Sequence, residues 1–161
     1  MRVALYGRTP KQEDIIYVQS LISIIEQSHE YILIHEAFYE KIIDKIVFAK
    51  PVKCFTIKEE LIKEADILLS LGGDGTLLDT LPIVGNSQIP ILGINIGHLG
   101  FLTSVGRDGI SNLLEELKAE KYQTENHSIL NVDDSRLNIN NRFALNDICL
   151  RSAKAGDLLD I

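Results

Sequence analysis

Short apolar runs alternate with amphipathic stretches over residues 1–103, and this alternation restricts the fold more than any other feature of the sequence. Apolar runs with the length of strands lie at 3–6, 31–34, 66–71 and 91–95. Between them, hydrophobic residues recur at helical spacing over 12–27 and 38–47, and a polar helix is predicted over 58–64. Such elements form βαβ units with right-handed crossovers. We therefore expect an α/β fold, a Rossmann-like parallel sheet with helices on both faces.

The pattern changes after Phe101. One helix is predicted over 108–120, and two polar, alternating stretches at 122–133 and 142–150 predict antiparallel strands with a hairpin near 138–141. We expect three parts: an α/β domain over 1–103, a connecting helix over 104–121, and the opening strands of a β-rich C-terminal domain over 122–161. The apolar pattern at 158–161 has no partner strand after it, which predicts a truncated second domain.

Composition and charge are those of a globular protein that does not bind nucleic acid. Of the 161 residues, 45% are hydrophobic and 24% are charged. The formal net charge of -7 argues against a nucleic-acid surface, for which a basic face is expected. Cys54 and Cys149 are far apart and predict neither a zinc site nor a disulfide framework, so we expect a cytoplasmic protein. No run approaches the roughly 18 apolar residues of a membrane span.

The apolar run at 66–71 leads into a glycine turn with one carboxylate, Gly72-Gly-Asp-Gly-Thr76. In parallel sheets, ligands bind at the carboxyl ends of strands. Glycines can take positive φ and bring backbone N–H groups close to a phosphate chain. Thr76 is predicted to cap a helix that begins at Leu77. A carboxylate beside phosphates is unfavourable unless a cation or a proton transfer accompanies it, so Asp74 is the candidate catalytic residue.

The same turn also has a plain structural interpretation, because Asp and Gly are common in tight connections. It does not match the better-known phosphate loops. The chain has no G-x-x-x-x-G-K-[ST] sequence and no G-x-G-x-x-G after the first strand. Neither a P-loop NTPase nor an ordinary Rossmann dinucleotide site is therefore predicted.

Three segments resemble the NAD kinase family: Gly72-Gly-Asp-Gly-Thr76, Pro90-Ile-Leu-Gly-Ile-Asn-Ile-Gly-His-Leu-Gly-Phe-Leu-Thr103 and Ala144-Leu-Asn-Asp147. The second is the most discriminating, because the glycine motif also occurs in diacylglycerol and sphingosine kinases and, in a related form, in phosphofructokinases. Lipid kinases usually continue with Val-Asn-Glu, whereas Leu77-Leu-Asp-Thr80 follows here. The family's later Thr-Pro-Thr-Gly-Ser-Thr-Ala-Tyr motif does not occur, so we expect a polypeptide that ends at Ile161 to be inactive or nearly so.

The resemblance implies transfer of the γ-phosphate of ATP to the 2′-hydroxyl of the adenosine ribose of NAD, which forms NADP. It implies Asp74 as the proton acceptor, a weak base that takes the proton late in a loose phosphoryl transfer. Gly75 is implied to contact NAD, and Gly72, Gly73 and Thr76 to form the phosphate-facing surface. Mg²⁺ or another divalent metal is expected with ATP, because it offsets the repulsion between Asp74 and the phosphates. No metal site made of protein side chains is predicted.

Further nucleotide contacts are implied in two places. Asn146 and Asp147 match an Asn-Glu pair that binds the NAD substrate in the family, although a strand-terminal Asx turn is the alternative interpretation. Phe101 is available to pack on the adenine or, alternatively, in the core. Four residues at the end of the strand at 91–95 or just after it are implied to line the nucleotide pocket: Asn95, Gly97, His98 and Gly100.

Two positions depart from the pattern of the family. Asp147 replaces the more usual Glu, which shortens the side chain by one methylene. Asp79 stands where many members have Arg or Lys near the phosphates, and a carboxylate there does not help to hold ATP. We therefore expect the phosphates to be neutralised from another part of the chain.

The expected partners are small-molecule nucleotides, without nucleic acid or membrane, and the resemblance implies a homo-oligomer when the protein is complete. Two other functions stay open: a lipid or sugar kinase of the same glycine-aspartate superfamily, and a non-catalytic nucleotide-binding module, which Asp79 favours. The sequence does not distinguish ATP from polyphosphate as donor, or NAD from NADH as acceptor.

Overall fold

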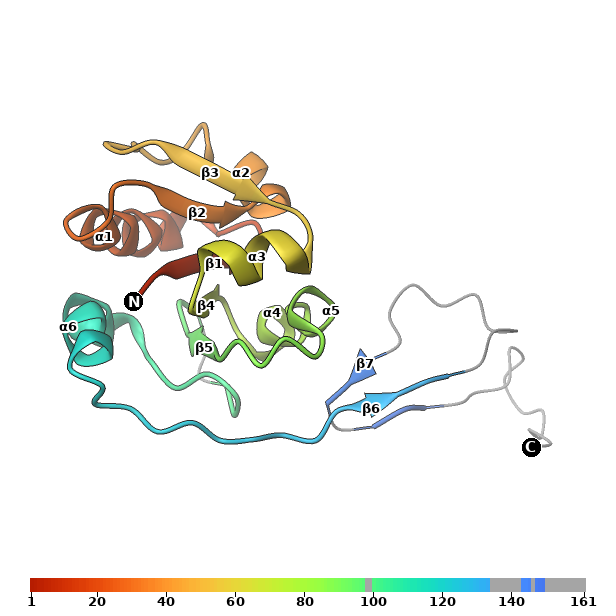
Figure 1. Ribbon diagram of the computed structural model, residues 1–161. Coiled ribbons are helices and arrows are strands. Elements are labelled where there is room, and N and C mark those ends of the chain that lie inside the picture. Colours follow the sequence, from red (N-terminus) through yellow and green to blue (C-terminus); the bar gives the residue numbers. More distant parts are fainter. Residues whose placement is uncertain (98–99, 134–142, 146, 150–161) are drawn as a thin grey trace. The chain divides into compact units, whose positions relative to one another are not determined.

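The computed structural model describes residues 1–97, 100–133, 143–145 and 147–149 (Figure 1). The chain divides into two compact units, Met1–Glu125 and Asn126–Ile161, and each is described by itself. In the part of the chain that the structure describes, no helix has the length and apolar character needed to cross a membrane.

A five-stranded parallel sheet lies at the centre of the first unit, in the order β3-β2-β1-β4-β5 (Figure 1). Its strands are β1 (Val3–Gly7), β2 (Ile32–His35), β3 (Val52–Phe55), β4 (Ile67–Leu71) and β5 (Ile91–Ile94). β1 pairs with β4 from Val3 opposite Ile67 to Gly7 opposite Leu71. The chain leaves β1 towards β2 but leaves β4 towards β5, so the strand order reverses between β1 and β4. Ligands of such sheets bind outside the carboxyl ends of the strands at this reversal.

Helices cover both faces of the sheet, which confirms the predicted α/β fold. One face is covered by three α-helices and one 3₁₀ helix: α1 (Ile15–Glu26), α2 (Glu36–Ile42), η2 (Arg107–Asn112) and α6 (Leu113–Lys118). A second 3₁₀ helix, η1 (Gln12–Asp14), leads into α1. The other face is covered by α3 (Lys58–Glu64) and α5 (Leu81–Val84), which pack on Ala4, Leu33 and Leu68. The short helix α4 (Asp74–Leu78) follows β4 directly.

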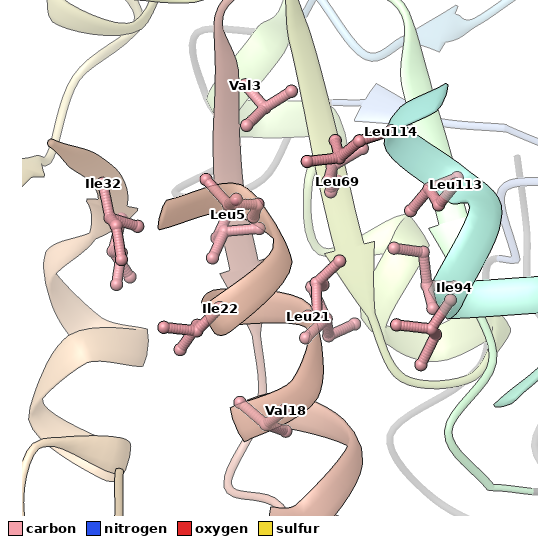
Figure 2. Close-up of a cluster of buried hydrophobic side chains, with 14 of the residues drawn as sticks. Val3, Leu5, Val18, Leu21, Ile22, Ile32, Leu69, Ile94, Leu113 and Leu114 are labelled. Atoms are coloured by element: carbon pink, nitrogen blue, oxygen red, sulfur yellow. The ribbon is translucent and has the colours of Figure 1, made fainter. Parts of the chain in front are cut away.

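The larger core joins the sheet to α1 and α6 (Figure 2). Val18, Leu21 and Ile22 recur at helical spacing in α1 and are fully buried. Figure 2 shows Leu113 and Leu114 of α6 on the side of β4 and β5. α6 therefore completes the same hydrophobic core as α1, and the predicted connecting helix belongs to the first compact unit.

The second unit contains a two-stranded antiparallel sheet of β6 (Leu130–Asn131) and β7 (Phe143–Ala144). Its antiparallel pairing agrees with the prediction, but each strand has only two residues. The predicted hairpin near 138–141 and the apolar pattern at 158–161 lie outside the described residues. The predicted divisions at 103 and 121 stay predictions.

Candidate active site

Asp74 is the first residue of α4 and lies just beyond the carboxyl end of β4. The preceding Gly73 is the N-cap, with an extended backbone at φ -90° and ψ -170°. Its carbonyl accepts hydrogen bonds from the N–H groups of Thr76 at 2.9 Å and Leu77 at 3.2 Å. The helix therefore begins three residues before the predicted start at Leu77, and the predicted capping role of Thr76 is wrong.

Gly72 is the residue of the turn that must be glycine. Its φ is +150°, and a Cβ at this position would overlap Oγ1 of the buried Thr76. Thr76 thus supports the turn from inside the protein, and its place on a phosphate-facing surface stays a prediction. Gly73 and Gly75 do not have a positive φ. The prediction that glycines of this turn take a positive φ is therefore confirmed for Gly72 alone.

The carboxylate of Asp74 is held by the loop that follows β5. Oδ2 accepts a hydrogen bond from the backbone N–H of Phe101 at 2.8 Å, and Oδ1 accepts one from Leu102 at 3.0 Å. These two bonds hold the pKa of Asp74 below its usual range, because they stabilise the charged form. Each oxygen keeps a second lone pair for another donor. Asp74 is therefore an ionised acceptor at neutral pH.

Gly100 allows this arrangement. A Cβ on Gly100 would overlap Oδ1 of Asp74, so no larger residue fits while the carboxylate holds its present position. The glycine turn after β4 and the loop after β5 were predicted as separate motifs. The structure brings them together at one carboxylate.

The buried Asn95 shapes the loop from within. Its Oδ1 accepts a hydrogen bond from the N–H of Gly97 at 2.8 Å, and its Nδ2 donates to Oγ1 of Thr103 at 3.2 Å. These bonds fix the two ends of the loop that carries Phe101. Direct contact of Asn95 with a nucleotide stays a prediction, and His98 lies outside the described residues.

The side chain of Phe101 is fully exposed, at 103% of its reference area. The alternative interpretation as a core residue is therefore wrong. Its backbone N–H donates to the carboxylate of Asp74, so the exposed ring belongs to a residue that contacts this carboxylate and is free to stack on a ligand. Stacking on the adenine stays a prediction.

An ion pair that the sequence did not predict lies beside the glycine turn. Nε of Arg8 is 2.6 Å from Oδ2 of Asp79, and Nη2 is 2.8 Å from Oδ1. The hydrogen bond with Asp79 raises the pKa of Arg8. The hydroxyl of Tyr6 donates to the same carboxylate at 3.4 Å, and burial followed by the charge of Asp79 raises the pKa of Tyr6. Of Tyr6, Arg8 and Asp79, only Asp79 stood out in the sequence, as an acidic residue where many family members have a basic one.

The remaining predicted ligand residues belong to the second unit. Asp147 is exposed there, and Asn146 lies outside the described residues. Their contact with a nucleotide stays a prediction. Among the described residues, no group of three or more His, Cys, Asp or Glu side chains is arranged to hold a metal ion.

Comparison with known proteins finds relatives that match along the chain. Residues 3–122 match the family described as ATP-NAD kinase N-terminal domain. The NAD kinase of Cytophaga hutchinsonii is 32% identical over 163 positions, which cover 100% of this chain and 56% of the relative. The NAD kinase of Helicobacter pylori strain P12 is 34% identical over 148 positions, covering 90% of this chain and 49% of the relative. The chain spans about half the length of these curated relatives.

A solved structure shows the same fold. It is the yeast NADH kinase complexed with NADH, which superposes with a TM-score of 0.65 and 18% sequence identity. The match covers 83% of this chain and 43% of the yeast chain.

Proposed function

Because the chain belongs to the ATP-NAD kinase family through its N-terminal domain, we propose that the full-length protein is an NAD kinase. It transfers the γ-phosphate of ATP to the 2′-hydroxyl of the adenosine ribose of NAD and forms NADP and ADP. The observation that carries this proposal is the position of Asp74. Its ionised carboxylate lies at the carboxyl end of β4, beside the reversal of strand order, where ligands of α/β sheets bind.

Asp74 acts as the proton acceptor in the proposed reaction. The ribose 2′-oxygen forms a bond to the γ-phosphorus, the bond between that phosphorus and the bridging oxygen of ADP breaks, and the hydroxyl proton passes to Asp74. A carboxylate with a lowered pKa is a weak base, so the proton moves late, when the hydroxyl has become acidic. In such a loose transfer, positioning and charge stabilisation supply most of the acceleration. The N–H groups of Phe101 and Leu102 keep the carboxylate in position.

Mg²⁺ or another divalent metal enters the proposed reaction as the complex with ATP. The side chains of Asp74 and Asp79 already accept hydrogen bonds from protein donors, so a metal bound through the phosphates fits this site better than one bound by carboxylates alone. Gly72, Gly73 and Thr76 form the proposed phosphate side, and Gly75 is proposed to contact NAD. Five further residues form the proposed nucleotide contacts: Asp74, Asn95, Phe101, Asn146 and Asp147. A cytoplasmic location and a homo-oligomeric state are part of the proposal.

The test is Asp74→Asn in the full-length protein, with NADP formation from NAD and Mg·ATP as the measurement. Turnover is expected to fall about 10²- to 10⁴-fold, the usual contribution of a positioned acid or base, while NAD still binds. Asp66→Asn is the matched control. Asp66 precedes β4, and its carboxylate also accepts a backbone N–H, from Arg2 at 2.7 Å. Turnover retained by Asp74→Asn would remove Asp74 from the mechanism.

The choice of acceptor separates this proposal from the two other functions. The wild-type protein is expected to phosphorylate NAD and to leave diacylglycerol and fructose 6-phosphate unchanged. The same assay with NADH and with polyphosphate defines the acceptor and the donor. Binding of NAD without any phosphoryl transfer would instead indicate a non-catalytic nucleotide-binding module.

A further inference from the structure

Arg8 follows β1 directly and lies beside the glycine turn that follows β4. Its Nη2 donates to the carbonyl oxygen of Gly75 at 3.3 Å, and its Nη1 is 3.4 Å from the position of a Cβ on Gly75. Gly75 is the residue after Asp74. The guanidinium group therefore lies against the same motif that carries the reactive carboxylate.

The guanidinium group of Arg8 is held by hydrogen bonds that its Nε and Nη2 donate. Asp79 accepts from Nε and Nη2 of Arg8, and Tyr6 donates to Asp79. The ring of Tyr6 packs edge-on against His35, at 5.3 Å between ring centroids. The two N–H groups on Nη1 make no hydrogen bond with any residue that the structure describes. A fixed guanidinium with two free donors suits a phosphate oxygen.

We propose that Nη1 of Arg8 binds a phosphate group of the nucleotide at this site, and that Asp79 and Tyr6 are positioning residues for it. The inference rests on the proposed function for the identity of the nucleotide. It explains the acidic residue at position 79, where the sequence led us to expect a cation. In this proposal Asp79 does not contact the phosphate. It holds the guanidinium group of Arg8, which does.

A second ion pair in the same fold, between Arg2 and Asp66, provides a comparison, because every nitrogen of its guanidinium group donates to a protein acceptor. Arg2 precedes β1 as Arg8 follows it, and its Nε and Nη2 both bond to Asp66. Its Nη1, however, donates to the carbonyl oxygen of Lys63 at 2.6 Å. Both side chains are largely exposed, at 50% for Arg2 and 61% for Arg8. The difference between them is the unused Nη1 of Arg8 beside the glycine turn.

The experiment is direct binding of Mg·ATP and of NAD, measured separately by titration calorimetry on the full-length protein. Arg8→Gln is expected to weaken one of the two nucleotides about 10- to 100-fold, the usual effect of losing a hydrogen bond to a charged group. The nucleotide that is weakened identifies the phosphate as that of ATP or as the diphosphate of NAD. Arg8→Lys keeps the charge without the planar fork and is expected to recover part of the binding.

Arg2→Gln is the matched control and is expected to bind both nucleotides as the wild type does. Asp79→Asn removes the carboxylate and keeps the cation, so it is expected to lose much less affinity than Arg8→Gln. The proposal is overturned if Arg8→Gln binds both nucleotides as Arg2→Gln does, if Asp79→Asn loses as much as Arg8→Gln, or if the wild type binds neither nucleotide. Binding that depends on Arg8 in a protein that forms no NADP would overturn the NAD kinase proposal and support this one.

Discussion

The tightest packing at the site is between the carboxylate of Asp74 and the backbone of Gly100. The carboxylate occupies the space that a Cβ of residue 100 would need, and the next two N–H groups of the loop bond to its oxygens. The carboxylate of Asp74 can therefore hold its observed position only because residue 100 has no side chain. This relation joins two residues from different loops.

Gly100→Ala is expected to reduce NADP formation about 100-fold, because displacement of a reacting group by about 1 Å has an effect of that size. The measurement is turnover of the full-length variant, with thermal unfolding recorded in parallel. Gly106→Ala is the control, since nothing lies within 4 Å of a Cβ at that position and its φ is -87°. Equal turnover of the two variants would show that the position of Asp74 does not depend on Gly100.

At this scale the sequence indicated Asp74 as the candidate catalytic residue, and this role stays a prediction. It did not predict the arginine that lies beside the glycine turn. Asp74 stands in a recognisable run of glycines, whereas Arg8 lies in an ordinary turn after the first strand. The two become neighbours because β1 and β4 pair in parallel and end together, with Gly7 opposite Leu71. A pairing between residues so far apart in the sequence leaves no local pattern.

Among the elements, η1 and η2 are joined by an ion pair on one side of the sheet. Nη2 of Arg107 is 2.5 Å from Oδ1 of Asp14, and its Nε donates to the carbonyl oxygen of Ile96 at 2.7 Å. The side chain of Asp14 is 7% exposed, and that of Arg107 is 35% exposed. Arg107 thus ties the segment after β5 to the start of α1.

Arg107→Leu is expected to lower the free energy of unfolding by about 2–3 kcal/mol, because it leaves the buried carboxylate of Asp14 without its cation. This is below the loss for a fully buried pair, since part of Arg107 reaches solvent. Urea unfolding followed by circular dichroism measures the change. The double variant Asp14→Leu with Arg107→Leu is expected to lose less than the single one, and a double variant that loses more would contradict the explanation.

Four of the strands were predicted from their apolar runs, but β3 was not. β1, β2 and β4 are largely buried along their length, and most of their residues are hydrophobic. β3 lies at the edge of the sheet, and of its four residues only Phe55 is buried, while Lys53 and Cys54 are exposed. An edge strand with polar positions has no clear periodicity, so no strand was predicted there.

At the scale of the whole chain, the hydrophobic cores that the described residues form lie within the first unit. Both clusters of buried residues fall between Val3 and Leu117. None of the described residues of the second unit is buried. The alternation of strands and helices was enough to predict the fold class, because it determines which faces must be covered. The extent of the first unit was not predicted, since the packing of α6 on the sheet depends on contacts with distant residues.

Residues 1–125 are therefore expected to fold without the second unit. Their thermal or urea unfolding, followed by circular dichroism, is expected to be a single cooperative transition. Leu69→Ala in the same fragment removes a fully buried side chain and is expected to cost about 2–5 kcal/mol. A gradual transition that this substitution does not shift would show that residues 1–125 lack a specific core.

The bonds from Phe101 and Leu102 to Asp74 have a spectroscopic consequence. The two amide protons point at a negative charge, so their resonance frequencies and their exchange with deuterium depend on whether that charge is present. Because the pKa of Asp74 is lowered, both signals are expected to change at a lower pH than the ordinary pKa of an aspartate would give. The backbone thereby reports the ionisation of Asp74 without a substrate or an added probe.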